Sequence, residues 1–401
     1  MSTRAHLPTT VSIVSYNLWL IPFSGAWNLG RTSRCAGALT AAANELASEV
    51  DSTALQIVAV QEAWAFRVGL FWPLLWLAYK LEAAVLKTGL VAGRKESKIH
   101  SLVKNMYMLC AAIFTLLAQA WVPLLRNILW NPKPRLAAAL KQRAKLPWQT
   151  DGVDAYCRLP PWVWRPCLMD SGLLMCASEP ADASGFVAFN RESSMEAAAF
   201  KGLLWARWWG GLGVINTHMT FEYADGGAQR RKQRAALAAL TARLLGLSVA
   251  DGSSSAVCDP SCGLDRIAAS SCGCDAVLIT GDFNHALPEQ CTAGAAGVPP
   301  PNSPCPYAYP WLPAEASLAD LLSVLRLGGR ATVERLSSDA PTNEDGTVDH
   351  LFVVTRATHA LGYSAVHASV VADDAAEVSD HLMIKSVVRL RPRTGAYEAS
   401  T

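Results

Sequence analysis

Six short polar motifs occur along this chain, and each one comes at the end of an apolar segment that is typical of a buried strand. They are Tyr16-Asn17, Gln61-Glu62, Asn216-Thr217-His218, Gly281-Asp282-Phe283-Asn284, Val348-Asp349-His350 and Ser379-Asp380-His381. Polar residues just past buried strands converge on one edge of a layered sheet, where α/β folds commonly place their sites. The chain must therefore fold so that strands far apart in sequence end at a common place.

The strands themselves are predicted from short runs of apolar, β-branched and aromatic residues. These runs are Val11–Leu20, Gln56–Gln61, Gly172–Ala177, Gly185–Asn190, Gly202–Trp208, Gly213–Thr217, Ala276–Thr280, His350–Val354, Ala365–Val371 and Met383–Leu390. Apolar residues at helical spacing predict helices over Arg31–Leu46, Gln229–Leu245 and Leu318–Leu327. The order of strand, helix and strand at the start of the chain indicates an α/β layered domain.

The motifs contain the oxygen ligands that a hard divalent cation prefers. Mg²⁺ takes a few carboxylate and amide oxygens and keeps several waters, and we expect Mn²⁺ to substitute for it. Glu62 directly follows a buried strand and is the natural anchor ligand, and Asn17 can add an amide oxygen or hold a metal-bound water. A single carboxylate at the end of a strand is usually a solvated residue, so this prediction depends on the whole set of motifs.

The same set suits the hydrolysis of a phosphate ester, which needs a base for water and donors for the developing negative charge. His381 is the expected general base, because imidazole titrates near neutral pH, and Asp349 would orient it. Asp282 would hold or deprotonate the attacking water, while Asn284 and His218 would donate hydrogen bonds to phosphate oxygens.

In this order, the motifs resemble those of the endonuclease/exonuclease/phosphatase superfamily, over roughly residues 11–64 and 168–391. The matching residues are Asn17, Glu62, His218, Asp282, Asn284, Asp349, Asp380 and His381. The resemblance implies a four-layered α/β sandwich with two central, mostly antiparallel sheets. It also implies a metal-dependent phosphoric ester hydrolase in which the Asp380 and His381 pair is catalytic.

A second set of motifs is similar to those of the neutral sphingomyelinases within that superfamily. Asp170–Leu174 (DSGLL) resembles one of their strands, and the "KG" turn at Lys201 implies a catalytic role for this lysine. In that group an aspartate five residues earlier pairs with the lysine; Glu196 stands at that position here and would have to replace it. The helix after the "NTH" motif resembles theirs in a basic residue, Arg230 or Arg231, and in Gln233.

An apolar and mostly helical segment, residues 65–167, interrupts the pattern. Met106–Leu125 has no charged residue and is long enough to span a bilayer, whereas Val68–Val91 contains three charged residues. Glu62 precedes this insert and the other site residues follow it, so the insert must cross a membrane an even number of times or not at all. We expect a hairpin that enters the membrane or rests on it beside the site. A helical subdomain that packs on the catalytic core is the alternative.

These boundaries predict a discontinuous catalytic domain over residues 1–64 and 168–393, an insert over residues 65–167 and a tail over residues 394–401. The charged fraction of 17% is low for a soluble domain, and with 14 tryptophans it favours contact with a membrane. Val11–Phe23 lacks a clear cleavage site, so we expect no signal peptide. Four cysteines cluster in a polar stretch of the chain: Cys258, Cys262, Cys272 and Cys274. They lack the spacing of a strong zinc motif, so we expect free thiols in a polar loop, with a local disulfide as the alternative.

Together, the motifs and the insert predict cleavage of a phospholipid headgroup bond, with sphingomyelin split into ceramide and phosphocholine as the leading reaction. The expected partners are a phospholipid or sphingolipid and a membrane, and the expected location is membrane-associated and intracellular. A nuclease of the same superfamily is an alternative, although the net charge of +2 does not favour a nucleic-acid partner. An inositol-phosphate phosphatase would need an extended motif that is missing near Asp349. A catalytically dead membrane scaffold would not need the complete polar set.

Overall fold

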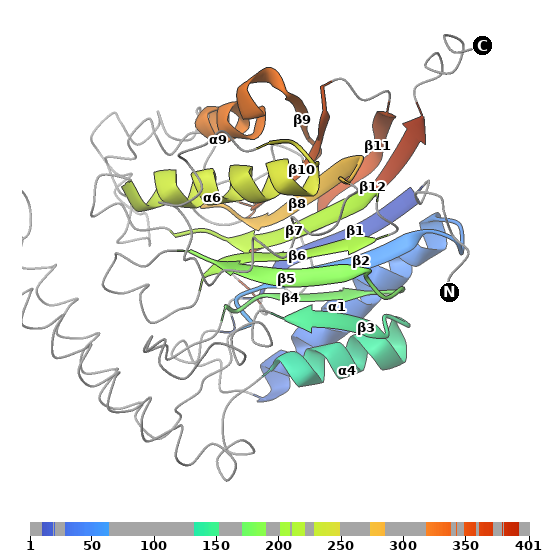
Figure 1. The fold of residues 1–401 in the computed structure, drawn as a ribbon. Coiled ribbons are helices and arrows are strands. Elements are labelled where there is room, and N and C mark those ends of the chain that lie inside the picture. The colour runs from blue at the N-terminus through green and yellow to red at the C-terminus, as the bar shows by residue number, and fades with distance from the viewer. Residues whose placement is uncertain are drawn as a thin grey trace, which may run out of the picture.

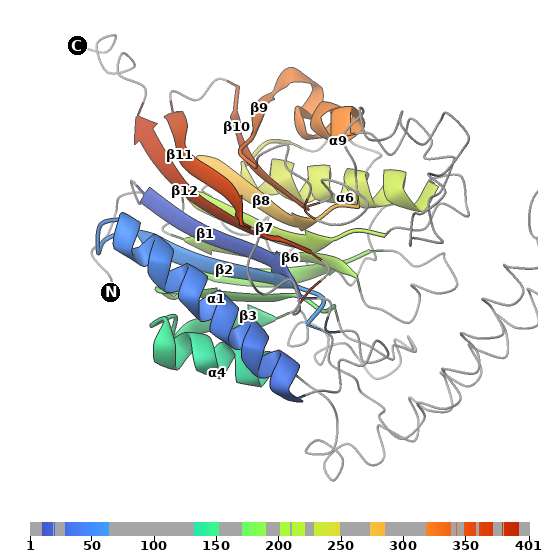
Figure 2. The ribbon, with the colours of Figure 1, turned by 180° about the vertical axis from the view of Figure 1, so that it is seen from behind.

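A computed structural model of the chain describes residues 10–18, 20, 29–63, 132–151, 171–189, 201–208, 211–220, 228–248, 273–284, 318–337, 342, 349–357, 361–371, 379 and 381–392. These residues form an α/β sandwich in which two sheets pack face to face between two layers of helices (Figures 1 and 2). The fold class expected from the sequence is therefore confirmed.

Each sheet has six strands. The first sheet contains, in spatial order, β11 (Leu361–Val371), β12 (Met383–Pro392), β1 (Thr10–Asn17), β2 (Leu55–Gln61), β4 (Leu174–Ala177) and β3 (Trp148–Asp151). The second sheet contains β5 (Ala183–Ala188), β6 (Gly202–Trp208), β7 (Leu212–His218), β8 (Ala276–Asp282), β10 (Asp349–Arg356) and β9 (Ala331–Arg335). Within each sheet one central pair is parallel, β1 with β2 and β7 with β8, and the other pairs are antiparallel.

The outer layers consist of helices on opposite faces of the sandwich. The helix α1 (Leu29–Glu49) and the helix α4 (Lys133–Arg143) cover the first sheet, while α6 (Ala228–Leu244) and α9 (Leu318–Leu325) cover the second (Figures 1 and 2). A short 3-10 turn, η4 (Leu327–Gly329), follows α9.

Three apolar cores result from strict alternation along the strands, because successive side chains of a strand point to opposite faces. Ile13 of β1 packs between the sheets, and its neighbour Val14 packs under α1 and α4. In the second sheet Leu278 packs between the sheets and Ile279 packs against α6 and α9. The central strands are buried on both faces, which explains their nearly continuous apolar sequences.

The structure adds elements inside the range predicted as an insert. Both α4 and β3 lie within residues 65–167, yet α4 packs beside α1 and β3 pairs with β4 in the first sheet. Residues 132–151 of that range therefore belong to the sandwich. The predicted hairpin of Val68–Val91 and Met106–Leu125 lies outside the described residues.

Among the residues that the structure describes, no helix is both long enough and apolar enough to cross a bilayer. Of the four clustered cysteines only Cys274 is described, and it is a buried free thiol of the core beneath α6. Burial raises the pKa of this thiol to about 12, so it is inert at neutral pH.

Candidate active site

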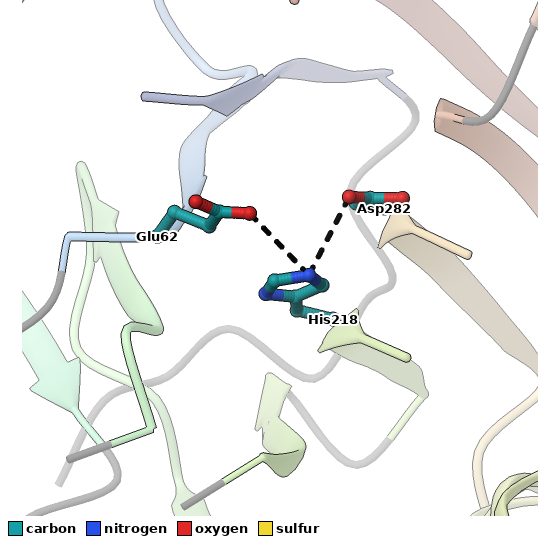
Figure 3. Close-up of side chains that lie close together, drawn as sticks. All are labelled: Glu62, His218 and Asp282. Carbon is teal, nitrogen blue, oxygen red and sulfur yellow. Dashed lines mark ion pairs between the residues drawn. The ribbon is translucent and has the colours of Figure 1, made fainter. Parts of the chain in front are cut away.

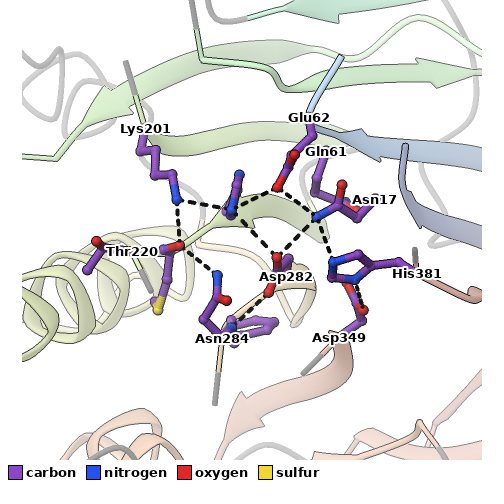
Figure 4. Close-up of polar contacts among 12 residues, drawn as sticks. Asn17, Gln61, Glu62, Lys201, Thr220, Asp282, Asn284, Asp349 and His381 are labelled. Carbon is purple, nitrogen blue, oxygen red and sulfur yellow. Dashed lines mark hydrogen bonds and ion pairs between the residues drawn. The ribbon is translucent and has the colours of Figure 1, made fainter. Parts of the chain in front are cut away.

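The sequence-predicted site residues that the structure describes lie together at one end of the two sheets (Figure 4). They are Asn17, Glu62, Lys201, His218, Asp282, Asn284, Asp349 and His381. All are buried except Asn284, which is partly buried. Asp380, Asp170 and Glu196 lie outside the described residues. The first sheet contributes the ends of β1 and β2, and the second contributes the ends of β7 and β8, so the cluster joins both sheets.

Unusual backbone conformations turn the chain at the end of two of these strands. Glu62 follows β2 with a φ of 55°, and Asn284 follows β8 with a φ of 50°, which is the left-handed region that a glutamate seldom adopts. Gly281 has a φ of 138°, and a Cβ there would lie 1.9 Å from the carbonyl oxygen of Thr217 on β7. Left-handed residues at such positions are typical of functional sites, where the surrounding structure offsets the strain.

Asn17 lies at the centre of the cluster, where its side-chain amide faces residues of both sheets. Its Nδ2 donates to Glu62 Oε1 at 3.2 Å and to Asp282 Oδ2 at 3.1 Å, and it lies 3.4 Å from His381 Nε2. These hydrogen bonds show that the amide nitrogen of Asn17, rather than its oxygen, faces the two carboxylates. Asn17 therefore organises the carboxylates in this structure.

Glu62, His218 and Asp282 direct potential ligand atoms at one another (Figure 3). The Nε2 atom of His218 lies 3.5 Å from Glu62 Oε1 and 3.5 Å from Asp282 Oδ2. One ligand atom from each residue lies within 4.8 Å of the others, and this spacing would allow the three to share a metal ion. A second group with the same property consists of Asp282, Asp349 and His381, so Asp282 belongs to both.

The protonation state of His218 suits a metal ligand. Burial and the neighbouring charges of Lys201 and His381 lower the pKa of this imidazole well below its usual value. The Lys201 ammonium has only donors, so at its distance of 3.0 Å the His218 Nε2 atom must accept, and the ring proton is then on Nδ1. In this structure the Nε2 lone pair accepts from Lys201, and a divalent cation held with the neighbouring carboxylates would take the same lone pair of the neutral imidazole.

Asp282 is the carboxylate that the site perturbs most. Burial and the neighbouring charge of Asp349 raise its pKa to about 7, with Glu62 adding to the rise and His381 and Lys201 opposing it. The rise comes mainly from burial, which disfavours the charged carboxylate, and the neighbouring carboxylates add to it. Three buried carboxylates with an imidazole are a donor set that a divalent cation would satisfy, so the residues fit a metal.

Asp349 is hydrogen-bonded to His381 in a way that would orient this imidazole as a general base. Asp349 Oδ2 accepts from His381 Nδ1 at 2.7 Å, which leaves Nε2 with its lone pair facing the centre of the cluster. Ser379, which the sequence interpretation had left without a role, holds this loop in place. Its hydroxyl donates to the carbonyl oxygen of Asn17 at 2.6 Å and accepts from the backbone N–H of His381 at 3.1 Å.

Lys201 lies in the cluster, as the "KG" motif predicted, and its described contacts are with His218 at the end of β7 and with the next residue, Met219. The expected pairing with Glu196 lies outside the described residues. The Nζ of Lys201 donates to the carbonyl oxygen of Met219 at 3.0 Å and to His218 Nε2 at 3.0 Å. The same Met219 carbonyl accepts from Asn284 Nδ2 at 3.0 Å, and the backbone N–H of Asn284 donates to Asp282 Oδ1 at 2.8 Å. Lys201 and Asn284 are thus fixed on the same carbonyl, on the side of the site opposite His381 (Figure 4).

Further hydrogen bonds support the site from behind. Some join the two sheets, and another lies beside Glu62. Gln61 Nε2 donates to Asn216 Oδ1 at 2.6 Å, which links β2 to β7 across the core, and Asn216 Nδ2 donates back to the Val60 carbonyl at 2.9 Å. Gly172, in the DSGLL motif, has a φ of 66° and accepts from the N–H of Ala63 at 2.8 Å. The described part of that motif therefore supports the turn that carries Glu62.

Comparisons with known proteins give a likeness in fold. No family model matches the chain, and no curated protein matches it. Sphingomyelinase C from Streptomyces griseocarneus is 13% identical over 94% of this chain and 99% of that chain, with a TM-score of 0.42. A mutant of beta toxin from Staphylococcus aureus with bound magnesium ions is 13% identical over 94% and 98%, with a TM-score of 0.42. A humanized D. rerio TDP2 is 13% identical over 95% and 99%, with a TM-score of 0.41. At these values the chemistry has to be argued from the residues of this chain.

Proposed function

We propose that this protein is a metal-dependent hydrolase of phosphate diesters, and that its substrate is the headgroup bond of sphingomyelin or a related phosphosphingolipid. The main support for the proposal is that two groups of side chains lie side by side and both include or contact Asp282. One is the potential ligand group of Glu62, His218 and Asp282, and the other is the His381–Asp349 pair. Hydrolysis of a diester needs both a charge-neutralising site and a base, and here they are adjacent.

Glu62, Asp282 and His218 would hold a divalent cation, Mg²⁺ or Mn²⁺. When bound, such an ion would neutralise charge on phosphoryl oxygens. The Nε2 of His218 carries the lone pair that this role needs, which modifies the expectation that His218 donates to phosphate. Lys201 is the cation on this side of the cluster, and its ammonium can donate to a phosphate oxygen together with the amide of Asn284.

His381 would remove the proton from the attacking water. Asp349 accepts the Nδ1 proton and so fixes the tautomer in which Nε2 is the free base. As the imidazole becomes cationic, the Asp349 carboxylate stabilises the new charge over a distance of 2.7 Å. Asp282, whose Oδ1 is held by the N–H of Asn284, would orient the same water on its other oxygen.

The lipid part of the proposal is supported by the sphingomyelinase-like motifs and by the apolar insert, rather than by the cluster itself. Lys201, the residue of the "KG" motif, lies 3.0 Å from His218. The uncharged stretch Met106–Leu125 is long enough to span a bilayer and would hold the enzyme at a membrane. We therefore propose a membrane-associated, intracellular enzyme whose partners are the lipid substrate and the bilayer that contains it.

A substrate panel tests the reaction. Purified protein with Mg²⁺ is incubated in parallel with sphingomyelin micelles, glycerophospholipid micelles, plasmid DNA and inositol polyphosphates. We expect phosphocholine release from sphingomyelin, loss of the activity with EDTA, and loss in His381→Ala but not in Glu49→Gln, which changes an exposed carboxylate at the end of α1. Cleavage of DNA without cleavage of lipid would refute the lipid assignment, and activity that survives EDTA would refute the role of the metal.

A second experiment tests the proposed membrane contact with the full chain. Two charges are introduced into the apolar stretch by Phe114→Asp and Leu117→Asp, and binding to sphingomyelin-containing vesicles is measured by co-sedimentation. We expect most of the vesicle binding to be lost while cleavage of short-chain lipid in detergent is retained. Undiminished sedimentation would show that Met106–Leu125 is not the contact.

A further inference from the structure

Arg230 is a buried cation that makes contacts outside the helix on which it lies. It is the third residue of α6, and only 1% of its surface is exposed. Its Nε donates to the carbonyl oxygen of Thr220 at 2.8 Å. Its Nη2 donates to the carbonyl oxygens of Phe283, at 3.3 Å, and of Asn284. One guanidinium therefore binds three main-chain oxygens.

These oxygens belong to the two segments that leave the parallel strands of the second sheet. Thr220 follows β7, which ends at His218, and Asn284 follows β8, which ends at Asp282. One turn further along α6, the Gln233 side chain accepts from the N–H of Thr220 at 2.9 Å. The first two turns of α6 thus hold both backbone groups of Thr220, and Arg230 also ties this segment to Asn284.

The contact reaches the site through one further step. Thr220 is the neighbour of Met219, whose carbonyl oxygen accepts from both Lys201 Nζ and Asn284 Nδ2. Asn284 has a left-handed backbone with a φ of 50°, and Arg230 binds the carbonyl of that same residue. If the two segments separated, Lys201 and Asn284 would lose their common acceptor, and the Asn284 amide would no longer have a fixed direction.

We propose that Arg230 is a positioning residue that holds Asn284 and Lys201 in register with Asp282. The proposal rests on the function proposed above, since it assigns these two side chains to the phosphate. Only an arginine suits the role, because its planar group offers five donors in a fixed fork, whereas a lysine is a point charge on a flexible stem. Three carbonyl oxygens also offset part of the cost of burying the cation.

Arg230→Lys tests this with a matched control on the same helix. Arg234 is also a buried arginine, 5% exposed, but its Nη1 faces Asp320 on α9 at 3.8 Å, away from the site. In the phosphocholine-release assay with Mg²⁺, we expect Arg230→Lys to lower kcat by roughly 10- to 100-fold with little change in KM, because a small misplacement of a positioned group costs this much. Arg234→Lys should keep kcat within about 2-fold of wild type. Equal losses in both variants would refute a specific role for Arg230.

A double-mutant cycle separates positioning from general stability. If Arg230 acts through Asn284, then Arg230→Lys in an Asn284→Ala background should lower kcat by only about 3-fold or less, because the side chain that it positions is already gone. Additive losses would mean that Arg230 does not act through Asn284, and they would overturn the proposal.

Hydrogen exchange gives a readout that does not need a substrate. In Arg230→Lys we expect faster exchange at the amides of Thr220 and Asn284, with the amides of β1 and β2 unchanged, and no such change in Arg234→Lys. If wild type cleaves none of the diesters offered, the proposed function fails, and these amides alone then decide whether Arg230 holds the two segments. Unchanged exchange at both amides would refute the positioning role whatever the activity.

Discussion

Replacing Asp282 with asparagine is expected to make the metal-free protein more stable at pH 8 while abolishing its activity. Asp282 is 1% exposed, and burial together with the charge of Asp349 raises its pKa from 3.8 to about 7. The folded state therefore binds the proton more tightly than the unfolded state does. A raised pKa contributes stability that is fully present below pH 3.8 and is lost as the pH rises through about 7.

The size of this effect follows from linkage. A pKa of about 7 when folded and 3.8 when unfolded gives a loss of about 3 kcal/mol in unfolding free energy between pH 5 and pH 8 from this one carboxyl. An asparagine has no proton to lose. The stability of Asp282→Asn relative to wild type should therefore rise by about 3 kcal/mol between pH 5 and pH 8.

Urea unfolding in EDTA at the two pH values measures the difference, with Asp320→Asn as the control because that carboxylate is half exposed on α9. The control should follow wild type at both pH values. Saturating Mg²⁺ at pH 8 should stabilise wild type and leave Asp282→Asn nearly unchanged, since ligand binding to the folded state adds stability. Parallel stability curves for wild type and Asp282→Asn in EDTA would refute the reasoning, because they would show that Asp282 ionises as easily in the folded state as in the unfolded one.

Three further predictions concern the base, the metal and the backbone. Asp349→Asn should lower kcat on the order of 100-fold or more, because the 2.7 Å bond that fixes the tautomer of His381 is lost, and normal turnover would contradict this role. Glu62→Gln should weaken Mg²⁺ binding in calorimetry by at least about 10-fold, whereas Glu49→Gln, at an exposed position of α1, should not change it. Gly281→Ala should lower the unfolding free energy by about 3 kcal/mol or more in urea titrations, because its Cβ would meet the Thr217 carbonyl at 1.9 Å; an unchanged unfolding midpoint would refute this.

The central strands could be predicted from the sequence because a strand that is buried on both faces is a nearly continuous run of apolar residues. Gly202–Trp208 was predicted with the same bounds as β6, and the apolar run at Ala276–Thr280 lies within β8. Two of the four edge strands, β5 and β11, were predicted in part from the apolar runs Gly185–Asn190 and Ala365–Val371, but the other two were not. Neither β3 (WQTD) nor β9 (ATVER) was predicted, since an edge strand has exposed positions that need no apolar residue. The helix α4 lies within residues 65–167, which were predicted to be mostly helical. The apolar composition of that range did not show that this helix would pack on α1.

Most chemical residues of the site could be predicted because they lie at the ends of strands in recognisable motifs, as Glu62 does after β2. Asp349 and His381 instead lie at the start of strands: Asp349 is the first residue of β10, and His381 precedes β12. The contacts of the supporting residues could not be predicted. The resemblance named Arg230 or Arg231 on this helix, but arginines are mostly exposed in proteins, so only the tertiary structure shows that Arg230 is buried against the backbone of Asn284. Gln61 and Asn216 are in the motifs, yet their contact across 155 residues joins two sheets whose packing no local pattern encodes.

The separation in sequence between Asn17 and His381, 364 residues, has a consequence for biosynthesis. The strand β1 lies between β2 and β12 in the first sheet, and β12 follows His381. While the ribosome is still making the later part of the chain, β1 can pair with β2 but its other edge stays open. The nascent chain therefore holds an unfinished sheet and an incomplete centre until β12 has left the ribosome. The cluster that joins Asn17 to His381 cannot form before that point of synthesis.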